Sequence, residues 1–526
     1  MNPSSKLSTL LLALSCSLPL AAQTFRWASQ GDAQTMDPHS QNEGLTNSMN
    51  QQVYERLVAR DKALNFTPSL ASEWTQTGPL VWRFKLRPNV KFHDGAAFSA
   101  DDVLFSLKRA QDPNSQVSTY ANALGEAVKI DPLTVEFRLK APNPVFLQHL
   151  DALFIMNLAW AEKHKVQKPL DYKNKEETYA STHANGTGPY VLSSRAPSIK
   201  TTYRRNPAWW MAHEGNVQEI EYTPIANDAT RLAALISGEL DFVHDPAPRD
   251  IARLRTVAGV KVIDGPENRV IFIGMDQARD KLLYGKVPGD KNPFKDQRVR
   301  QALYQAIDIE AMKTKLMNGM AVPTGGMTPS PLAAFNDPAL ESRLPYDLAA
   351  ARKLMAEAGY ADGFEVAIDC PNNRYVNDEE ICVALASMWA QLKVKLRVNA
   401  MPRTLYFPKT EKLDTSMYML GWGGAVTDAE TTLTPVMRNR GEKGVGLYNY
   451  GNSRNDKFDA LAAQSSTEAD PKKREQLIRA ALAEWKAQVH TIPLHRQVIP
   501  WATRSNVGVV HRADNYVVMQ WVTLGK

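Results

Sequence analysis

The arrangement in this chain that best suits ligand binding is a tryptophan set between glycines and followed by two carboxylates. Trp422 lies in the stretch from Gly421 to Gly424, and Asp428 and Glu430 come next. Glycines let the backbone turn where other residues cannot, and the indole offers a flat apolar face with one N–H donor. An aromatic wall beside carboxylates suits a small polar or cationic ligand. The alternative is a buried tryptophan that anchors a loop.

Catalytic motifs give no comparable signal. The sequence has no G-x-S-x-G, Walker loop, H-E-x-x-H or strand-linked G-x-G-x-x-G. His490 and His495 are five residues apart, but Ile492 and Pro493 break a common helical face, so we expect neither a zinc site nor a cofactor. The pattern favours binding over catalysis. An exported hydrolase stays open as an alternative, because catalytic groups can come from distant segments.

Length and composition describe a soluble protein with more than one lobe. The chain has 526 residues, more than one compact core usually holds. Apolar residues make up 44% and charged residues 22%, which is ordinary for a globular protein. The formal charge is +6, and Lys and Arg are spread without a basic block. Nucleic acid is therefore not an expected partner.

The N-terminus has the pattern of a secretory signal peptide over residues 1–22. Lys6 precedes an apolar run from Leu7 to Leu20, which ends at the small residues Ala21 and Ala22. The run is too short to span a bilayer. Cleavage near Ala22 predicts a soluble, exported mature protein.

Two cysteines remain after the signal peptide. Cys370 and Cys382 would both lie in an oxidising compartment, where a disulfide closing a small loop is plausible. Two buried thiols are the alternative, because spacing in sequence does not show whether the sulfurs meet.

The elements that must position these residues alternate between strand and helix. Ser99 followed by Asp102 is typical of a capped helix start. The pattern over 220–242 predicts a strand, a helix and a second short strand, which together are typical of a βαβ-like unit. Period-two patterns predict strands and 3.6-residue patterns predict helices elsewhere. The predicted strands cover 24–28, 82–86, 135–139, 364–370, 395–398, 417–420 and 515–522, and the predicted helices cover 47–57, 296–316, 346–358, 381–392 and 472–488.

Several segments, in this order along almost the whole mature chain, resemble the extracellular solute-binding protein family 5. These are the periplasmic binding components of oligopeptide, dipeptide, glutathione and nickel ABC importers. The longest matching segment runs from Phe84 to Val103. The others are Val53-Tyr54-Glu55-Arg56-Leu57, Gly186-Thr187-Gly188-Pro189-Tyr190, Asn206-Pro207 with Trp209-Trp210, Ser237-Gly238-Glu239-Leu240-Asp241 and Pro493-Leu494-His495.

The resemblance implies an α/β fold like that of type II periplasmic binding proteins, with two hinged lobes plus an extra padding domain. Lobe I would be discontinuous. The implied division is residues 23–66, 186–268 and 496–526 for lobe I, 67–185 for the padding domain and 269–495 for lobe II.

The resemblance also implies site residues around the tryptophan. Peptide binders of the family have an aspartate three residues after it, which pairs with the ligand's α-ammonium; here that position is Ala425. Asp428 matches a more general acidic position, with a loop cap as the alternative role. Arg374 and Tyr375 lie where family members bind a ligand carboxylate, a task that suits a guanidinium.

The other candidate ligand contacts match no specific position of the family motif. Arg403 and Tyr406 follow the strand near residue 398, and Gln30 and Gly31 on the first lobe could add backbone contacts. Glu430 is a second possible partner for an ammonium.

The expected function is capture of a peptide or peptide-like solute by lobe closure and delivery to an inner-membrane ABC permease, by a periplasmic, monomeric, non-enzymatic protein. The same role with a non-peptide ligand (glutathione, an opine-like compound or a metal chelate) is the first alternative, and Ala425 favours it. A structural or adhesive role in the cell envelope is a further alternative.

Overall fold

The computed structural model describes residues 23–328, 337–423 and 428–525. The predicted signal peptide and Ala425 lie outside the described residues. Among the helices that are described, none combines the length and the apolar character needed to cross a membrane.

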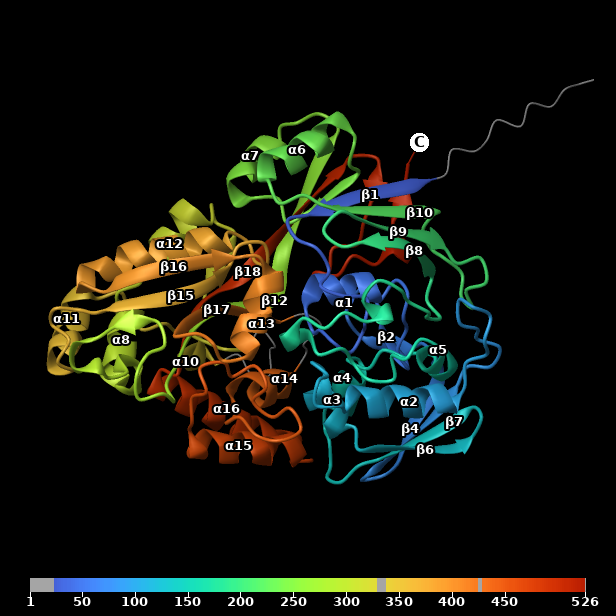
Figure 1. The fold of residues 1–526 in the computed structure, drawn as a ribbon, viewed down its shortest axis with the longest axis horizontal. Coiled ribbons are helices and arrows are strands. Elements are labelled where there is room, and N and C mark those ends of the chain that lie inside the picture. The colour runs from blue at the N-terminus through green and yellow to red at the C-terminus, as the bar shows by residue number, and fades with distance from the viewer. Residues whose placement is uncertain (1–22, 329–336, 424–427, 526) are drawn as a thin grey trace, which may run out of the picture.

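One mixed sheet of twelve strands runs through the molecule (Figure 1). In spatial order the strands are β13 (Gly285–Lys286), β15 (Glu365–Pro371), β17 (Met417–Gly423), β12 (Val260–Met275), β18 (Thr491–Arg504), β11 (Phe242–His244), β1 (Thr24–Ser29), β10 (Glu219–Pro224), β9 (Lys200–Arg205) and β8 (Tyr190–Ala196), with β14 (Ala321–Pro323) beside β18 and β16 (Lys395–Met401) beside β15. The sheet brings strands from both ends of the sequence close together, because only β11 lies between β1 and β18.

Two long antiparallel strands connect the halves of this sheet. β12 and β18 pair from Val260 opposite Arg504 to Gly274 opposite Thr491, with a break in register between Pro266 and Val270. We call β1 and β8 to β11 the first wing, and β13 and β15 to β17 the second wing. β12 and β18 therefore run continuously from one wing to the other.

Helices cover the second wing and bury its apolar strand faces. α12 packs against β15 and β16, where Ile381, Leu385 and Trp389 are fully buried. These residues keep the helical spacing that the sequence predicts. The helices on this side are α8 (Gln297–Gln305), α9 (Ile309–Ala311), α10 (Pro338–Glu341), α11 (Leu348–Glu357), α12 (Asp378–Trp389), α13 (Arg403–Glu411), α14 (Glu430–Thr432), α15 (Asp456–Thr467) and α16 (Pro471–Gln488).

The first wing has fewer helices. β1 pairs in parallel with β10 and β11, and α6 connects those two strands, which is the predicted βαβ-like unit. Asn227 caps α6 and Gly238 ends it in the left-handed conformation. The helices here are α1 (Gly44–Asn50), α6 (Asp228–Ser237) and α7 (Ile251–Leu254).

A separate antiparallel sheet of four strands lies below the first wing in Figure 1. We call this sheet with α2 to α5 the small-sheet domain. Its strand order is β4-β5-β7-β6, and Phe84 and Leu86 of β5 point into its core as the alternation predicts. Ser99 and Asp102 form the predicted capping box. The elements are β4 (Ala71–Gly78), β5 (Val81–Leu86), β6 (Glu126–Asp131), β7 (Thr134–Arg138), α2 (Ala100–Ala110), α3 (Ser118–Ala123), α4 (Phe146–Leu150) and α5 (Leu158–Lys163).

Two of the elements predicted from the sequence do not form as predicted. The helix over 47–57 ends at Asn50, because the carbonyls of Gln52 and Val53 accept hydrogen bonds from the backbone at 190 and 188. The strand over 515–522 does not form. There the backbone of Val517 bonds to the side chains of Ser48 and Gln52. The short strands are β2 (Val58–Arg60), β3 (Phe66–Pro68), β19 (Val507–Gly508) and β20 (Thr523–Leu524).

Candidate ligand-binding site

Two adjoining cavities lie between the wings and the small-sheet domain. They measure about 460 Å³ and about 600 Å³, and Asn42, Asn47, Gly423 and Tyr516 line both. We treat them together as the central cavity. Its remaining lining residues are Glu43, Gly44, Arg269, Arg374, Tyr375, Phe407, Leu420, Gly421, Trp422 and Tyr448 in the first part, and Arg56, Val117, Tyr120, Gln148, Asp151, Ala152, Phe154 and Thr431 in the second.

Glu43 joins the two sides of this cavity. Its carboxylate caps α1 through the backbone N–H groups of Leu45 and Thr46. It also lies 2.8 Å from Arg374 and accepts a hydrogen bond of 3.0 Å from Arg403. Both arginines belong to the second wing, on the other side of the cavity. Burial alone would raise the pKa of Glu43, but the two guanidinium groups outweigh it and lower the pKa to about 2. The carboxylate is therefore ionised and ties α1 to α13 (Figure 1).

Trp422 forms one wall at the end of β17. Its indole Nε1 donates to the carbonyl of Thr431 at 3.0 Å, and its ring centroid lies 4.7 Å from that of Tyr448. The next residue, Gly423, has to be a glycine. A Cβ at this position would lie 1.7 Å from the carbonyl oxygen of Asn268, so no larger residue could pair with β12. The indole is fixed in place, and its N–H is already engaged. What it offers a ligand is its ring face.

The second part of the cavity is bounded by the small-sheet domain. Asp151 accepts a 2.6 Å hydrogen bond from Arg60 and lies 3.8 Å from Arg56. Arg56 in turn stacks its guanidinium on Phe154, 4.0 Å from the ring centroid. Tyr120 and Gln148 complete this end with neutral polar groups.

The two predicted acidic contacts are engaged by other side chains. Asp428 accepts two hydrogen bonds from Arg474, at 2.6 and 2.8 Å, and caps the backbone N–H of Glu430 at 2.8 Å. Glu430 accepts a 2.7 Å bond from His149 Nε2 of the small-sheet domain. Neither residue is among those that line the central cavity.

The predicted basic and aromatic residues divide into two sets. Arg374 and Tyr375 line the cavity. Arg403 and Tyr406 are fully buried behind it, where the Tyr406 hydroxyl donates to the carbonyl of Met419. Arg403 instead supports Glu43.

Gln30 and Gly31 lie at the contact between the wings and outside the cavity lining. The Gln30 amide donates to the carbonyl of Tyr375 at 3.1 Å. The Gly31 carbonyl accepts from the Tyr222 hydroxyl, and the residue packs against Arg403. Both residues therefore contact the second wing.

A disulfide joins β15 to α12. The sulfurs of Cys370 and Cys382 lie 1.95 Å apart. The loop that it closes carries Arg374 and Tyr375. His495 is fully buried in β18, and among the described residues no group of three or more histidine, cysteine or acidic side chains is placed to hold a metal ion.

Sequence reasoning missed most of the lining. Asn42 and Tyr516 come from irregular segments that carry no motif, Asn47 lies in α1 and Arg269 lies within a strand. The family-like segment from Val53 to Leu57 contains Arg56 and could have pointed to that residue. The rest become neighbours only when three distant segments fold together.

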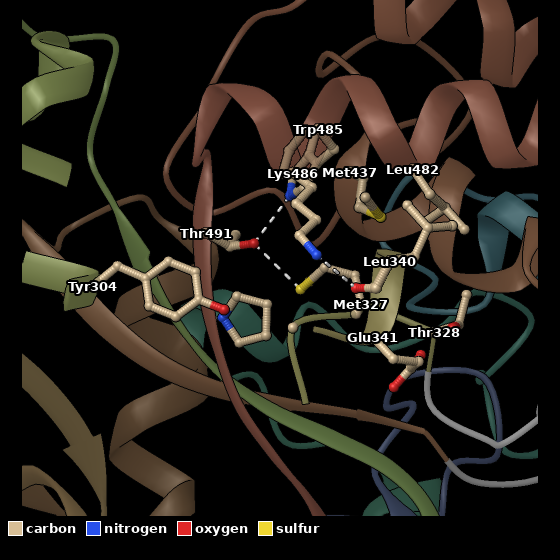
Figure 2. Close-up of a pocket in the computed structure, with 13 residues that line it drawn as sticks. Tyr304, Met327, Thr328, Leu340, Glu341, Met437, Leu482, Trp485, Lys486 and Thr491 are labelled. Atoms are coloured by element: carbon tan, nitrogen blue, oxygen red, sulfur yellow. Dashed lines mark hydrogen bonds between the residues drawn. The ribbon is translucent and has the colours of Figure 1, made fainter. Parts of the chain in front are cut away.

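A further cavity of about 430 Å³ lies beside α16, away from the central one (Figure 2). Several of its polar groups form hydrogen bonds within the protein. Thr491 accepts from the Trp485 indole at 2.9 Å and donates to the sulfur of Met327 at 3.2 Å, while Lys486 donates to the carbonyl of Leu340 at 3.1 Å. We take the central cavity as the candidate ligand site because Trp422, Arg374 and Tyr375 line it.

Comparison with known proteins agrees with the fold. Glutathione-binding protein GsiB of Escherichia coli O1:K1 is 26% identical over 477 residues, covering 89% of this chain and 88% of that protein. DppA from Helicobacter pylori, solved with the peptide STSA, superimposes with a TM-score of 0.84 at 21% identity, over 96% of this chain and 98% of that one. MoaA from A. tumefaciens R10, solved with mannopinic acid, gives a TM-score of 0.83 at 23% identity, over 96% and 100%.

The family assignment rests on the sequence profile described as bacterial extracellular solute-binding proteins, family 5. This profile matches residues 65–444, well over half of the chain. Its relatives include periplasmic binding proteins that serve ABC transporters. With this profile match and a type II binding-protein fold, this chain belongs to the bacterial extracellular solute-binding proteins of family 5.

Proposed function

We propose that this protein is exported to the periplasm, where it captures a peptide or peptide-like solute as a monomer and delivers it to an inner-membrane ABC permease. The observation that carries the proposal is the central cavity, which both wings and the small-sheet domain enclose. A ligand can contact all three parts only when they are together, so binding shifts the population toward the closed form.

The wings serve as the moving lobes in this proposal. The first wing belongs to lobe I (23–66, 186–268 and 496–526), the second wing belongs to lobe II (269–495), and the small-sheet domain is the padding domain (67–185). β12 and β18 run through both wings, and their register breaks between Pro266 and Val270. That break is where we place the hinge.

The proposed contacts are Trp422, Arg374 and Tyr375 from the second wing, with Asn42 and Asn47 from the first. The ring of Trp422 can stack on an apolar part of the solute, and the amides can bond to peptide groups. GsiB is named for glutathione, and DppA was solved with a peptide, which supports this ligand class. Asp428 and Glu430 are left out of the contact set because Arg474 and His149 engage them.

Mass spectrometry of the solute that co-purifies with the exported protein tests the proposal. The stripped protein is then titrated with peptides of two to six residues and with glutathione, and its melting temperature is recorded. At least one compound should raise the melting temperature, with Trp422→Leu reducing the effect. Trp74→Leu, in β4 of the small-sheet domain, is the matched control. If none of these compounds raises the melting temperature, the peptide ligand is ruled out.

A non-peptide ligand in the same transport role is the second candidate. Ala425 stands where peptide binders of the family have an aspartate, and MoaA was solved with mannopinic acid. Co-purification of such a compound, in place of a peptide, would favour this candidate.

The family consists of solute-binding proteins, and we propose that this chain binds without turnover. Ligand recovered after prolonged incubation should have unchanged mass. Hydrolysis of the recovered compound would favour an exported hydrolase instead.

A further inference from the structure

A large additional cavity adjoins the second part of the central cavity. It measures about 1200 Å³ and shares Arg56, Asp151 and Tyr516 with that second part. Tyr516 lines the first part as well. A solute that fills the central cavity therefore meets side chains that also bound this additional space. We call it the tryptophan cavity, after three of its lining residues.

The tryptophans of this cavity are Trp209, Trp210 and Trp521, and all three are half-buried. The indole N–H groups of Trp209 and Trp210 donate to the carboxyl group of Glu55 at 3.1 and 2.8 Å. Because their donors are engaged, these two side chains offer a ligand only their apolar ring surfaces. The walls therefore suit an apolar part of a solute, and the polar groups of the solute need other partners.

The acidic side chains of the tryptophan cavity are engaged within the protein. Five of them line it, and each accepts a hydrogen bond from another side chain. The pairs are Glu55 with Trp210, Asp61 with Asn65, Asp151 with Arg60, Glu214 with Lys62 and Asp514 with Arg512. Since an arginine or a lysine neutralises three of the five, we do not expect a cationic ligand here.

Arg56 differs from these residues because its N–H groups are unused. Of the three arginines that line the tryptophan cavity, Arg60 and Arg512 donate to carboxylates. Arg56 donates no hydrogen bond to a described residue, and its Nε is shielded from solvent. Asp151 lies 3.8 Å from this Nε, which is too far for a hydrogen bond. The guanidinium carbon lies over the ring of Phe154, 4.0 Å from its centroid, so the edge of the group is left for an acceptor.

Gln51 adds a second unused donor to the same cavity. Its amide Nε2 is shielded from solvent and has no partner among the described residues. A shielded donor without a partner costs free energy, which an acceptor on a ligand would recover. The edge of a guanidinium group matches an oxyanion through two parallel hydrogen bonds. These donors therefore suit a ligand group that is rich in acceptor oxygens.

Resting on the function proposed above, we propose that the tryptophan cavity is a second binding site for the same solute. The far end of the solute lies in it, with an apolar part against the tryptophan rings and an oxyanion bound by Arg56. Arg56 is then a specificity-determining residue. Pockets for small molecules measure about 300–1,000 Å³, a volume that the central cavity alone provides. The additional volume therefore favours an acidic, elongated, peptide-like solute over a dipeptide.

Two pairs of tetrapeptides test this proposal on the full-length protein stripped of bound solute. The pairs are Glu-Ala-Ala-Ala with Gln-Ala-Ala-Ala, and Ala-Ala-Ala-Glu with Ala-Ala-Ala-Gln. The members of a pair differ by one charge, and the two pairs cover both directions in which a peptide can lie. Calorimetry at constant ionic strength gives affinity and stoichiometry. In at least one pair the acidic peptide should bind about tenfold more tightly than the neutral one, with one peptide per protein.

Variants show whether Arg56 makes the contact. Arg56→Gln should remove the preference for the acidic peptide and leave the binding of the neutral peptide unchanged, while Arg56→Lys should keep part of the preference. Arg87→Gln is the matched control. The Arg87 guanidinium carbon lies 4.3 Å from the ring centroid of Trp210, but Arg87 does not line the cavity. This variant should therefore keep the preference of the wild type.

Ala59→Phe tests whether the solute enters the tryptophan cavity. Ala59, in β2, lines this cavity but neither part of the central one. A phenylalanine there should weaken the binding of all four tetrapeptides by about tenfold, and that of Ala-Ala by less, because the central cavity alone holds a dipeptide. The melting temperature of the empty variant checks its fold.

Inorganic phosphate is the minimal probe for the oxyanion site. It should raise the melting temperature of the wild type and of Arg87→Gln more than that of Arg56→Gln.

Three results would overturn the proposal. The first is equal binding of the acidic and the neutral peptide in both pairs, and the second is a preference for the acid that Arg56→Gln retains. The third is binding of two peptides to each protein, because the two cavities would then hold separate ligands. Failure of the transport proposal would look different: phosphate would still distinguish the wild type from Arg56→Gln, while no peptide binds and no solute co-purifies.

Discussion

Glu43 is the residue on which the contact between the wings most depends. It caps α1 on one side and pairs with Arg374 and Arg403 on the other. The sequence gives no sign of this, since Glu43 lies in an irregular segment far from both arginines. Only packing brings the three together, and burial makes the pairing energetically important.

Replacement of Glu43 by glutamine should destabilise the protein. Loss of one partner from a buried ionic cluster costs about 3–5 kcal/mol of unfolding free energy. The pKa of Glu43 is lowered to about 2, so this stabilisation is present above the ordinary value near 4.5 and is lost as the pH falls toward 2. Urea unfolding of wild type and Glu43→Gln should therefore differ strongly at pH 7 and much less at pH 2.5.

A matched control is Glu73→Gln. Glu73 pairs with Lys85 on the exposed face of β4, where a salt bridge contributes about 0–1 kcal/mol. A difference between wild type and Glu43→Gln that stays the same at both pH values would contradict the role given to this carboxylate.

At the scale of elements, the disulfide fixes the loop between β15 and α12. This loop carries Arg374 and Tyr375, and the bond spans a sequence separation of 12 residues. Closing a loop of this size stabilises a protein by about 3 kcal/mol, mainly by restricting the unfolded chain. The disulfide therefore links the stability of the second wing to the position of Arg374 and Tyr375, which line the central cavity.

The double variant Cys370→Ala/Cys382→Ala should unfold at a lower urea concentration than the wild type, by about 3 kcal/mol of unfolding free energy. Its affinity for the solute identified by co-purification should fall as well, because Arg374, a proposed ligand contact, loses its restraint. A reducing agent should shift the wild type toward the variant and leave the variant unchanged. Equal stability of the two proteins under oxidising conditions would contradict this prediction.

Local patterns predicted most of these elements well. Ser99 and Asp102 give α2 its start, and Ile381, Leu385 and Trp389 give α12 its buried face, because capping and periodicity act within a few residues. The prediction failed for residues 51–57 and 515–522. There, hydrogen bonds to distant backbone and side-chain groups replace the local pattern.

At the scale of the whole molecule, Glu411 lies where all three parts meet. It is buried at the end of α13, and Gln41 and Gln116 donate to it at 3.5 and 3.4 Å. Burial raises its pKa to about 7, well above the ordinary value, because the hydrogen bond from Gln41 and the charges of Lys173 and Arg440 offset only part of the effect of burial. In the folded protein this carboxyl group therefore holds its proton through mildly acidic pH.

The contribution of Glu411 to stability should fall as the pH rises from about 4.5 through 7, because the folded state then holds a proton that the unfolded state has released. Glu411→Gln imitates the protonated form. It should match the wild type at pH 5 and be more stable by roughly 1–3 kcal/mol at pH 8. Melting temperatures at constant ionic strength measure the difference.

The control is Glu365→Gln, an exposed residue that pairs with Lys395. It should show no such gain at alkaline pH. A Glu411→Gln variant that is less stable than the wild type at pH 8 would contradict the prediction.

The sequence by itself determined the family, the α/β class and Trp422 as a wall of the site. These depend on motifs in a fixed order and on local periodicity, which are properties of the sequence whatever its tertiary structure. The tertiary structure decided which charges are available to a ligand. Asp428 and Glu430 became engaged with Arg474 and His149, while Arg269 and Arg374 were brought together over Gly44. Whether a charge is free depends on its neighbours in space, and for these residues the neighbours come from segments up to several hundred positions away.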